Sequence, residues 1–243
     1  MFLKAFFLSL YKKKLVFLQK MYVRILKKFD MRFIILPLIF KGESWVEKIE
    51  TENIILREFE ISDAEEAFKN WAGIKRLADM SDFKVHSSAE ETRKMIEMGL
   101  GDGEGERYTI AVIFKDNMEL AGFIRIYEIS LENKTCKIEF VVGKKWQESN
   151  KDEFYVEAIN NIVFRLLRDG FDVVSYVHYN MHEDNDLKVR IIKEAGFEKE
   201  AVLHDRIVDK KTGNKYDKIV YTIFKKEWFN WKELLWLLQI KEK

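Results

Sequence analysis

The 243-residue sequence contains one cysteine, one proline and four histidines. A single thiol excludes an internal disulfide framework and any metal site built from several cysteines, and it favours a reducing, cytoplasmic compartment. The histidines show no HExxH spacing or similar pair, so they give no metal signal. With 47% hydrophobic and 34% charged residues, the chain can bury a core and is expected to fold over most of its length.

The chain as a whole also lacks an excess of either charge, because its net charge is only +1. This balance hides an asymmetry. Residues 1–41 hold ten Lys or Arg and one acid, whereas residues 42–243 hold 32 basic and 40 acidic residues. An acidic body presents no broad cationic surface to the phosphates of nucleic acid. We therefore expect no nucleic-acid partner for the body of the protein.

The N-terminal extension, residues 1–45, has no apolar run of the ~20 residues that cross a bilayer. Three lysines at 12–14 interrupt its apolar part and no small-residue cleavage site follows, so a signal peptide fits poorly. Residues 15–29 have the spacing of a basic amphipathic helix, a type that can lie on anionic lipid. The alternative is a misplaced start codon, because Met21 and Met31 both precede the recognisable domain. We expect an artefact or an inert extension rather than membrane contact.

The end of the chain is apolar over most of a helical circumference from Trp228 to Leu238. Such a helix must cover another surface. It can pack back on the domain or on the N-terminal extension, or it can form the contact in a homodimer. We therefore expect a C-terminal helix over residues 230–243, after a domain that spans residues 46–229.

Strand and helix patterns alternate through the domain. Capping-box signals at Ser62 and at Ser87-Ser88 precede two helices, and helical periodicity returns over 153–168 and 186–195. The order β, α, α, β, β, β, α, β, α, β, β predicts an α/β fold with a mixed sheet covered by helices. The expected strands lie at residues 53–59, 108–114, 120–129, 137–142, 173–178, 201–209 and 215–224.

Three passages of the domain carry a resemblance to a known family. Residues 51–57 and 62–64 (T-E-N-I-I-L-R and S-D-A) are similar to a "TERLxLR…SDA" opening. Residues 185–197 (N-D-L-K-V-R-I-I-K-E-A-G-F) are similar to an "NxxSxRVLEKAGF" signature, and residues 203–228 to a closing hairpin with a "D…EW" end. Together these passages resemble the GNAT N-acetyltransferases, especially the branch of ribosomal-protein N-terminal alanine acetyltransferases.

The resemblance implies a twisted, mostly antiparallel sheet with helices on both faces, whose fourth and fifth strands splay apart. It also implies transfer of an acetyl group from acetyl-CoA to a primary amine of a protein N-terminus or a small molecule. In the family, the pantetheine arm pairs with the backbone of the fourth strand, here Val141 and Val142. The diphosphate lies on a glycine-rich loop before the next helix, where unpaired N–H groups and the helix dipole attract an anion.

The phosphate-binding loop departs from the family pattern Q/R-x-x-G-x-G/A. Gln147 is retained, but Asn150 and Asp152 take the glycine places, or Lys151 and Glu153 do so if the alignment slides by one residue. Lys151 can meet phosphate, whereas the acids bring negative charge, although helix N-termini ordinarily favour acids. Two hypotheses stay open: an N-acetyltransferase, or a catalytically inactive GNAT-fold protein that binds a ligand or partner.

Acetyl transfer needs an amine that has lost its proton, so a base is expected near the splay. Glu139 occupies a fourth-strand position where several family members carry a glutamate, and alternation places it on the face opposite its apolar neighbours. His178, at a strand end, is a candidate proton relay or a structural histidine. Asn185 is a candidate polar contact to CoA or a helix cap. Ile192 stands where many GNAT enzymes carry a tyrosine general acid.

We expect the domain to fold without residues 1–40, because the strand and capping signals begin only near Thr51. The truncated protein should keep a cooperative thermal melt, followed by circular dichroism. A truncated protein that is insoluble or molten in repeat preparations would show instead that the N-terminal extension is part of the core.

Overall fold

The computed structural model describes residues 48–79, 84–98, 107–149, 151–179, 186–209 and 212–228. The expectations for the N-terminal extension and for the C-terminal helix fall outside the described residues. The strands are β1 (Ile49–Glu50), β2 (Ile54–Arg57), β3 (Tyr108–Phe114), β4 (Glu119–Ser130), β5 (Thr135–Val142), β6 (Val173–Tyr179), β7 (Glu198–Val208) and β8 (Lys215–Phe224).

The helical elements include short turns as well as helices. They are the 3-10 turns η1 (Ile61–Asp63) and η3 (Lys144–Trp146), the π-helical turn η2 (Phe68–Ala72), and helices α3 (Ala64–Ala67), α4 (Lys75–Asp79), α5 (Ala89–Glu97), α6 (Asp152–Asp169) and α7 (Asp186–Glu194). Within the described residues, no helix is long and apolar enough to cross a membrane.

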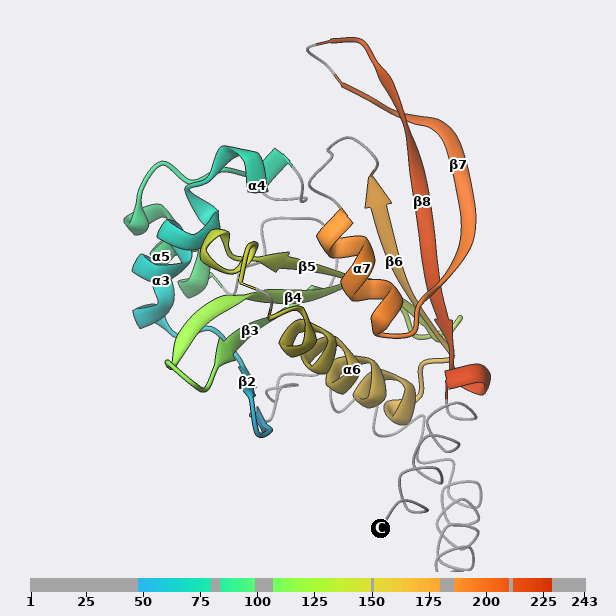
Figure 1. Cartoon of the computed structure of the whole chain (residues 1–243), viewed down its shortest axis with the longest axis horizontal. Coiled ribbons are helices and arrows are strands. Elements are labelled where there is room, and N and C mark those ends of the chain that lie inside the picture. Colours follow the sequence, from blue (N-terminus) through green and yellow to red (C-terminus); the bar gives the residue numbers. More distant parts are fainter. Residues whose placement is uncertain are drawn as a thin grey trace, which may run out of the picture. The chain divides into compact units, whose positions relative to one another are not determined.

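All eight strands belong to one sheet in the order β1-β2-β3-β4-β5-β6-β8-β7 (Figure 1). Every neighbouring pair is antiparallel except β5 and β6, which run parallel. The mixed, mostly antiparallel sheet predicted from the sequence is therefore confirmed. The two-residue strand β1 was not predicted, because so short a strand carries no alternation pattern.

Strands β5 and β6 pair over only part of their length. The parallel ladder joins Thr135–Ile138 to Val173–Tyr176. Beyond it, β5 stays paired with β4 as far as Val142, and β6 stays paired with β8 as far as Tyr179. The two strands therefore separate after the Ile138–Tyr176 pair, which is the predicted splay between the fourth and fifth strands.

Helices cover both faces of the sheet (Figure 1). On one face, Val141 joins a buried cluster with Trp71 of η2 and Phe123 of β4. On the other face, Phe114 lies against Tyr155 of α6, with ring centroids 5.3 Å apart. Helix α6 buries residues at the three- and four-residue spacing that aligns them on one side of a helix: Tyr155, Ala158, Ile159, Ile162, Val163, Leu166 and Leu167.

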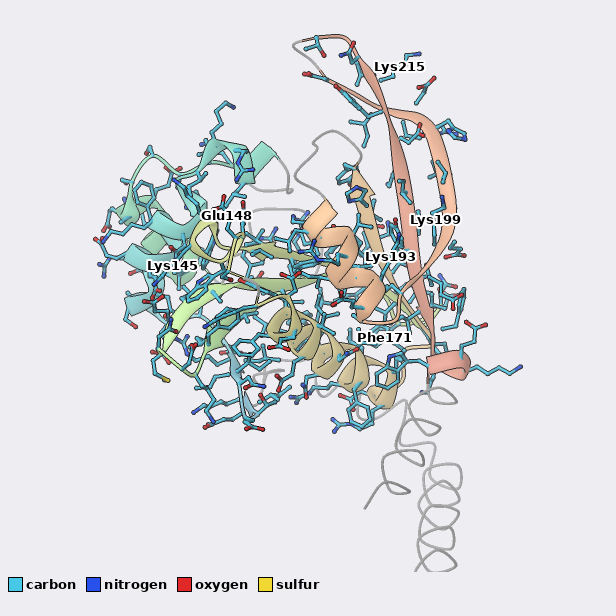
Figure 2. All side chains as sticks on the ribbon, viewed as in Figure 1. Lys145, Glu148, Phe171, Lys193, Lys199 and Lys215 are labelled. Atoms are coloured by element: carbon cyan, nitrogen blue, oxygen red, sulfur yellow. The ribbon has the colours of Figure 1, made fainter. Side chains whose placement is uncertain are left out.

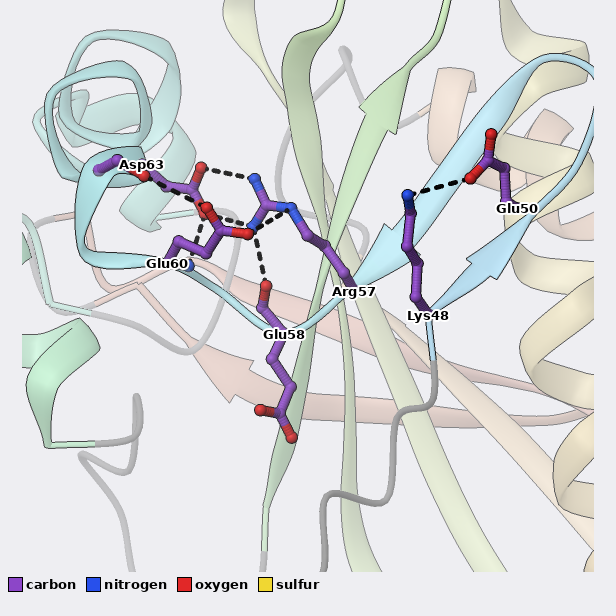
Figure 3. A network of polar contacts seen from close by, with 7 residues as sticks. Lys48, Glu50, Arg57, Glu58, Glu60 and Asp63 are labelled. Atoms are coloured by element: carbon purple, nitrogen blue, oxygen red, sulfur yellow. Dashed lines mark hydrogen bonds and ion pairs between the residues drawn. The ribbon is translucent and has the colours of Figure 1, made fainter.

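The start of the first helical region differs from the prediction. Ser62 lies inside η1 and does not cap the helix; Asp63 accepts the backbone N–H of Glu60 at 2.8 Å. Arg57 holds the same carboxylate through two hydrogen bonds of 2.7 and 2.8 Å (Figure 3). A bidentate, charge-assisted pair outcompetes a neutral hydroxyl. The helix start predicted at Ser87-Ser88 is confirmed, because Ser88 caps α5 by accepting the N–H of Glu91 at 3.2 Å.

Candidate active site

Glu139 lies at the mouth of the splay, as the first residue of β5 beyond the last pair with β6. It sits opposite Arg125 of β4, whose Nη1 donates to its Oε1 at 3.0 Å. The two side chains are 6% and 15% exposed, respectively. The predicted base is therefore part of a largely buried ion pair, which fixes its position at the start of the open edge.

Arg125 also belongs to the wall of a small cavity on the same face of the sheet. Its Nε donates to Thr109 of β3 at 3.2 Å, and its guanidinium lies 5.3 Å from the centroid of the Phe123 ring. The cavity has a volume of about 40 Å³ and continues between Trp71 of η2 and Met95 of α5. Space of this size holds a few water molecules. The cavity reaches Arg125, which is the ion-pair partner of Glu139.

His178 occupies the other face of the sheet. Because Ile138 and Tyr176 are parallel partners, Tyr176 and His178 share the face opposite Glu139. His178 is buried, and its ring centroid lies 6.4 Å from that of Tyr176. The structure therefore does not bring His178 together with Glu139, because two residues one position out of phase on neighbouring strands point to opposite sides.

Lys188 of α7 joins the face that carries His178. It is buried, with Nζ 5.7 Å from the centroid of the Phe140 ring. Phe140 in turn packs on Tyr176, with ring centroids 5.6 Å apart. Burial lowers the pKa of Lys188 to about 8, and the charge of Glu139 partly offsets that effect.

Two other titratable groups of these strands are poor proton donors. Burial raises the pKa of Cys136 in β5 to about 12, so its thiol is inert as a nucleophile. Burial also raises the pKa of Tyr176 above its ordinary value, and the nearby charge of Glu139 adds to the effect. Among the residues with defined positions, no group of His, Cys, Asp and Glu has the arrangement of a metal site.

The loop before α6 places Gln147 against the open edge of β5. Its Nε2 donates to the carbonyl of Val142 at 3.1 Å, and its Oε1 accepts from Arg76 of α4 at 2.7 Å. Val141 and Val142, the predicted backbone partners of pantetheine, lie in the separated part of β5. Glu148 follows in the same loop (Figure 2). Gln147 is thus a structural link between the loop and the strand.

Lys151 and Asp152 mark the start of α6, and both have ion-pair partners. Lys151 pairs with Asp116, and its Nζ lies 4.9 Å from the centroid of the Trp146 ring. Asp152 accepts a hydrogen bond of 2.7 Å from Nε of Arg190 on α7. Asn150 and Asn185, the other predicted CoA contacts, lie outside the described residues.

Sequence reasoning missed three residues that shape this site. Arg125 is the only charged residue in the otherwise apolar run 120–127, and Lys188 stands where the family signature has serine. Each departs from the pattern around it, and that departure was the signal by which the sequence could have pointed to it. Gly122 faces the carbonyl of Val141 so closely that an added Cβ would lie 1.9 Å from its oxygen. This contact depends on the strand register, which the sequence does not reveal.

Comparison with known proteins identifies the family. Residues 53–198 match the family model described as "Acetyltransferase (GNAT) domain". Because this match covers more than half of the chain, the protein belongs to the GNAT acetyltransferases. This confirms the resemblance at the level of the family, whose members generally use acetyl-CoA as co-substrate.

Two curated relatives are similar over most of the chain. An uncharacterized N-acetyltransferase of Bacillus licheniformis is 23% identical over 75% of this chain and 99% of its own length. An uncharacterized N-acetyltransferase of Bacillus subtilis is 24% identical over 73% of this chain and 96% of its own length.

Solved structures show the same fold. A GNAT-family acetyltransferase from Bacillus anthracis has a TM-score of 0.58 at 16% identity, covering 74% of this chain and 99% of its own. A ribosomal-protein-S5-alanine acetyltransferase from Vibrio fischeri has a TM-score of 0.58 at 14% identity, covering 75% and 99%. The ribosomal-protein branch stays a prediction for this chain.

The buried pair of Arg125 and Glu139 can be tested by a double-mutant cycle. Arg125→Met leaves an unpaired buried carboxylate, which should lower the free energy of unfolding by about 3–5 kcal/mol. Combining it with Glu139→Gln removes both charges and should recover most of that loss, measured by urea denaturation. Lys48→Met, which breaks an exposed pair with Glu50 (Figure 3), is the control and should change little. Purely additive losses would contradict the coupling.

Proposed function

We propose that the protein is an N-acetyltransferase that moves the acetyl group of acetyl-CoA to a primary amine of a protein N-terminus or a small molecule. The observation that carries this proposal is the open edge of β5 with Glu139 at its start. A strand edge without ladder partners offers backbone groups to an extended ligand. We place the reaction in the cytoplasm, where the reduced state of the buried Cys136 is maintained.

The residues at the open edge fit the pantetheine arm of acetyl-CoA. Residues 139–142 pair with β4 on one side and have separated from β6 on the other. The arm carries amide groups, so it can take the place of the missing strand. The hydrogen bond from the Gly143 N–H to the Ala121 carbonyl sets a register in which Val141 turns its backbone groups towards β4. Of the two predicted partners, Val142 is therefore the one that faces the arm. The thioester end would then lie near Glu139, just beyond the point where the ladder with β6 ends.

The start of α6 fits the diphosphate less well. The backbone N–H groups of the first turn and Lys151 are the groups that would hold it. Asp152 and Glu153 oppose it by their charge, and no glycine lets the backbone approach closely. We infer that the loop is degenerate and that it weakens binding of acetyl-CoA.

Glu139 is proposed as the base that takes the proton from the attacking amine, directly or through a water molecule. The acceptor would approach along the cavity on the α5 face, where Arg125 lines the wall and holds the carboxylate. Acetyl-CoA would approach from the edge between β5 and β6. His178 is a candidate relay only on the opposite face, away from Glu139.

The alternative function is that of a catalytically inactive protein that uses the GNAT fold to bind a ligand or partner. The loop supplies the observation that favours it. Lys151 pairs with Asp116 and Asp152 pairs with Arg190, so the charged groups of this site neutralise each other. The side chain of Gln147 also donates a hydrogen bond to the carbonyl of Val142 at the open edge. A measurement of acetyl-CoA binding distinguishes the transferase from the inactive alternative.

We expect acetyl-CoA to bind weakly to the native chain and more tightly after Asn150→Gly with Asp152→Gly. Glycine removes a side chain and a negative charge from the place where N–H groups face the diphosphate. Isothermal calorimetry measures both affinities. Because the alignment can slide by one residue, the pair Lys151→Gly with Glu153→Gly serves as the matched comparison. Tight binding by the native chain would defeat the degenerate-loop inference, and no binding by any of the three would favour the inactive alternative.

Glu139→Gln should lower the rate of acetyl transfer about a hundredfold or more and change its pH dependence, because an amide cannot accept the proton. The release of CoA is followed with a thiol reagent while a panel of amines is supplied as acceptors. Thermal melting checks that the variant is folded. If the rate and pH profile stay the same, Glu139 has no part in the reaction, and water or His178 is favoured as the acceptor of the proton.

A further inference from the structure

The face of the splay that is covered by α7 contains a buried cation. Lys188 is 9% exposed, and its Nζ lies 5.7 Å from the centroid of the Phe140 ring. Phe140 belongs to the part of β5 that has separated from β6. Lys188 therefore reaches from α7 to the start of the open edge, on the side opposite the carboxylate of Glu139.

The chemistry of the thioester sets a requirement at this place. When an amine displaces CoA, the sulfur leaves as a thiolate unless a proton is supplied, and an ordinary thiol has a pKa of about 8.5. A proton donor works best when its pKa is close to that of the leaving group and to the working pH. Burial raises the pKa of Cys136 to about 12 and that of Tyr176 above its usual range. Lys188, with a pKa lowered to about 8, meets the requirement.

Titratable groups from several elements surround this part of the splay. The charge of Glu139 in β5 acts on Lys188 from the opposite side of the sheet. Tyr176 of β6 packs on the Phe140 ring that lies under Nζ, and it neighbours His178 of β6 and Tyr221 of β8. On the exposed side of α7, Arg190 pairs with Asp152 of α6. Glu139 favours the charged lysine, whereas burial opposes it more strongly. One helical turn further along α7, Ile192 is buried and apolar, so it has no proton to give.

We propose that Lys188 is the proton donor to the sulfur of CoA during acetyl transfer. The inference rests on the proposed function. The amine nitrogen forms a bond to the acetyl carbon, the carbon–sulfur bond breaks, and the sulfur takes a proton from Nζ of Lys188. The amine proton goes to Glu139. Solvent then takes the proton from Glu139 and returns one to Lys188, so the products are the amide and CoA with a free thiol.

Binding tests the contact between Lys188 and sulfur without requiring turnover. At about pH 8, CoA should bind the native chain about tenfold more tightly than desulfo-CoA, because a charge-assisted contact to sulfur is present only with CoA. Lys188→Met fills the same space without a charge and should bring the ratio close to one. Lys193→Met, on the exposed side of the same helix (Figure 2), is the matched control and should keep the native ratio.

The pH dependence of the rate tests the proton transfer. Because Lys188 must be protonated to act, the native rate should fall as the pH rises through about 8. Lys188→Met should lower kcat about a hundredfold and abolish this fall, with little change in the KM of the amine. Lys188→Arg keeps the charge but holds its proton too tightly to give it up, so it should not restore kcat.

The outcomes distinguish this inference from the proposed function. If CoA binds but neither the ratio to desulfo-CoA nor kcat depends on Lys188, the inference is overturned and the transferase proposal stands. If neither CoA nor acetyl-CoA binds the native chain, both are overturned. The native pH profile needs no variant, so an alkaline rate that stays level above pH 8 overturns the inference even if Lys188→Met fails to fold.

Discussion

The site depends on the point at which the ladder between β5 and β6 ends. Each strand keeps its other neighbour: β5 remains paired with β4 to Val142, and β6 with β8 to Tyr179. The strands can therefore diverge without either losing its place in the sheet. The inner edge of β5 is left with backbone groups that need partners, because an unpaired buried polar group costs about 1–3 kcal/mol. The amide of Gln147 satisfies the Val142 carbonyl, and an extended ligand can satisfy the remaining groups.

The same divergence divides the charged groups between two faces. Strand alternation sends Glu139 to the side of Arg125 and the α5 cavity, whereas Lys188 approaches Phe140 from the α7 side. Both are largely buried, so each charge acts strongly on its surroundings. A carboxylate on one face and a cation on the other suit the proposed reaction, whose two substrates would enter from different sides of the sheet.

The sequence predicted the elements better than the contacts between them. Alternation and turn residues located the strands of the domain apart from β1, and alternation alone placed Glu139 on the face away from Phe140. The pairing of Arg125 with Glu139 depends on the register between β4 and β5, and a shift of one residue would send each side chain to the opposite face. The cap at Asp63 was missed for a related reason, because its partner Arg57 is brought close by the path of the chain.

Helix α7 carries two cations near the candidate site, Lys188 and Arg190. They differ in burial and in the partner that a ligand would have to replace. Lys188 is buried, whereas Arg190 and Asp152 are 54% and 22% exposed in their ion pair. An exposed pair contributes only about 0–1 kcal/mol, because water competes for both partners. A phosphate can accept two parallel hydrogen bonds from Arg190, as a carboxylate can. In the proposed binding mode, with the diphosphate at the start of α6, a phosphate would therefore have a cation to take over from Asp152, although no loop glycine lets the backbone approach it closely.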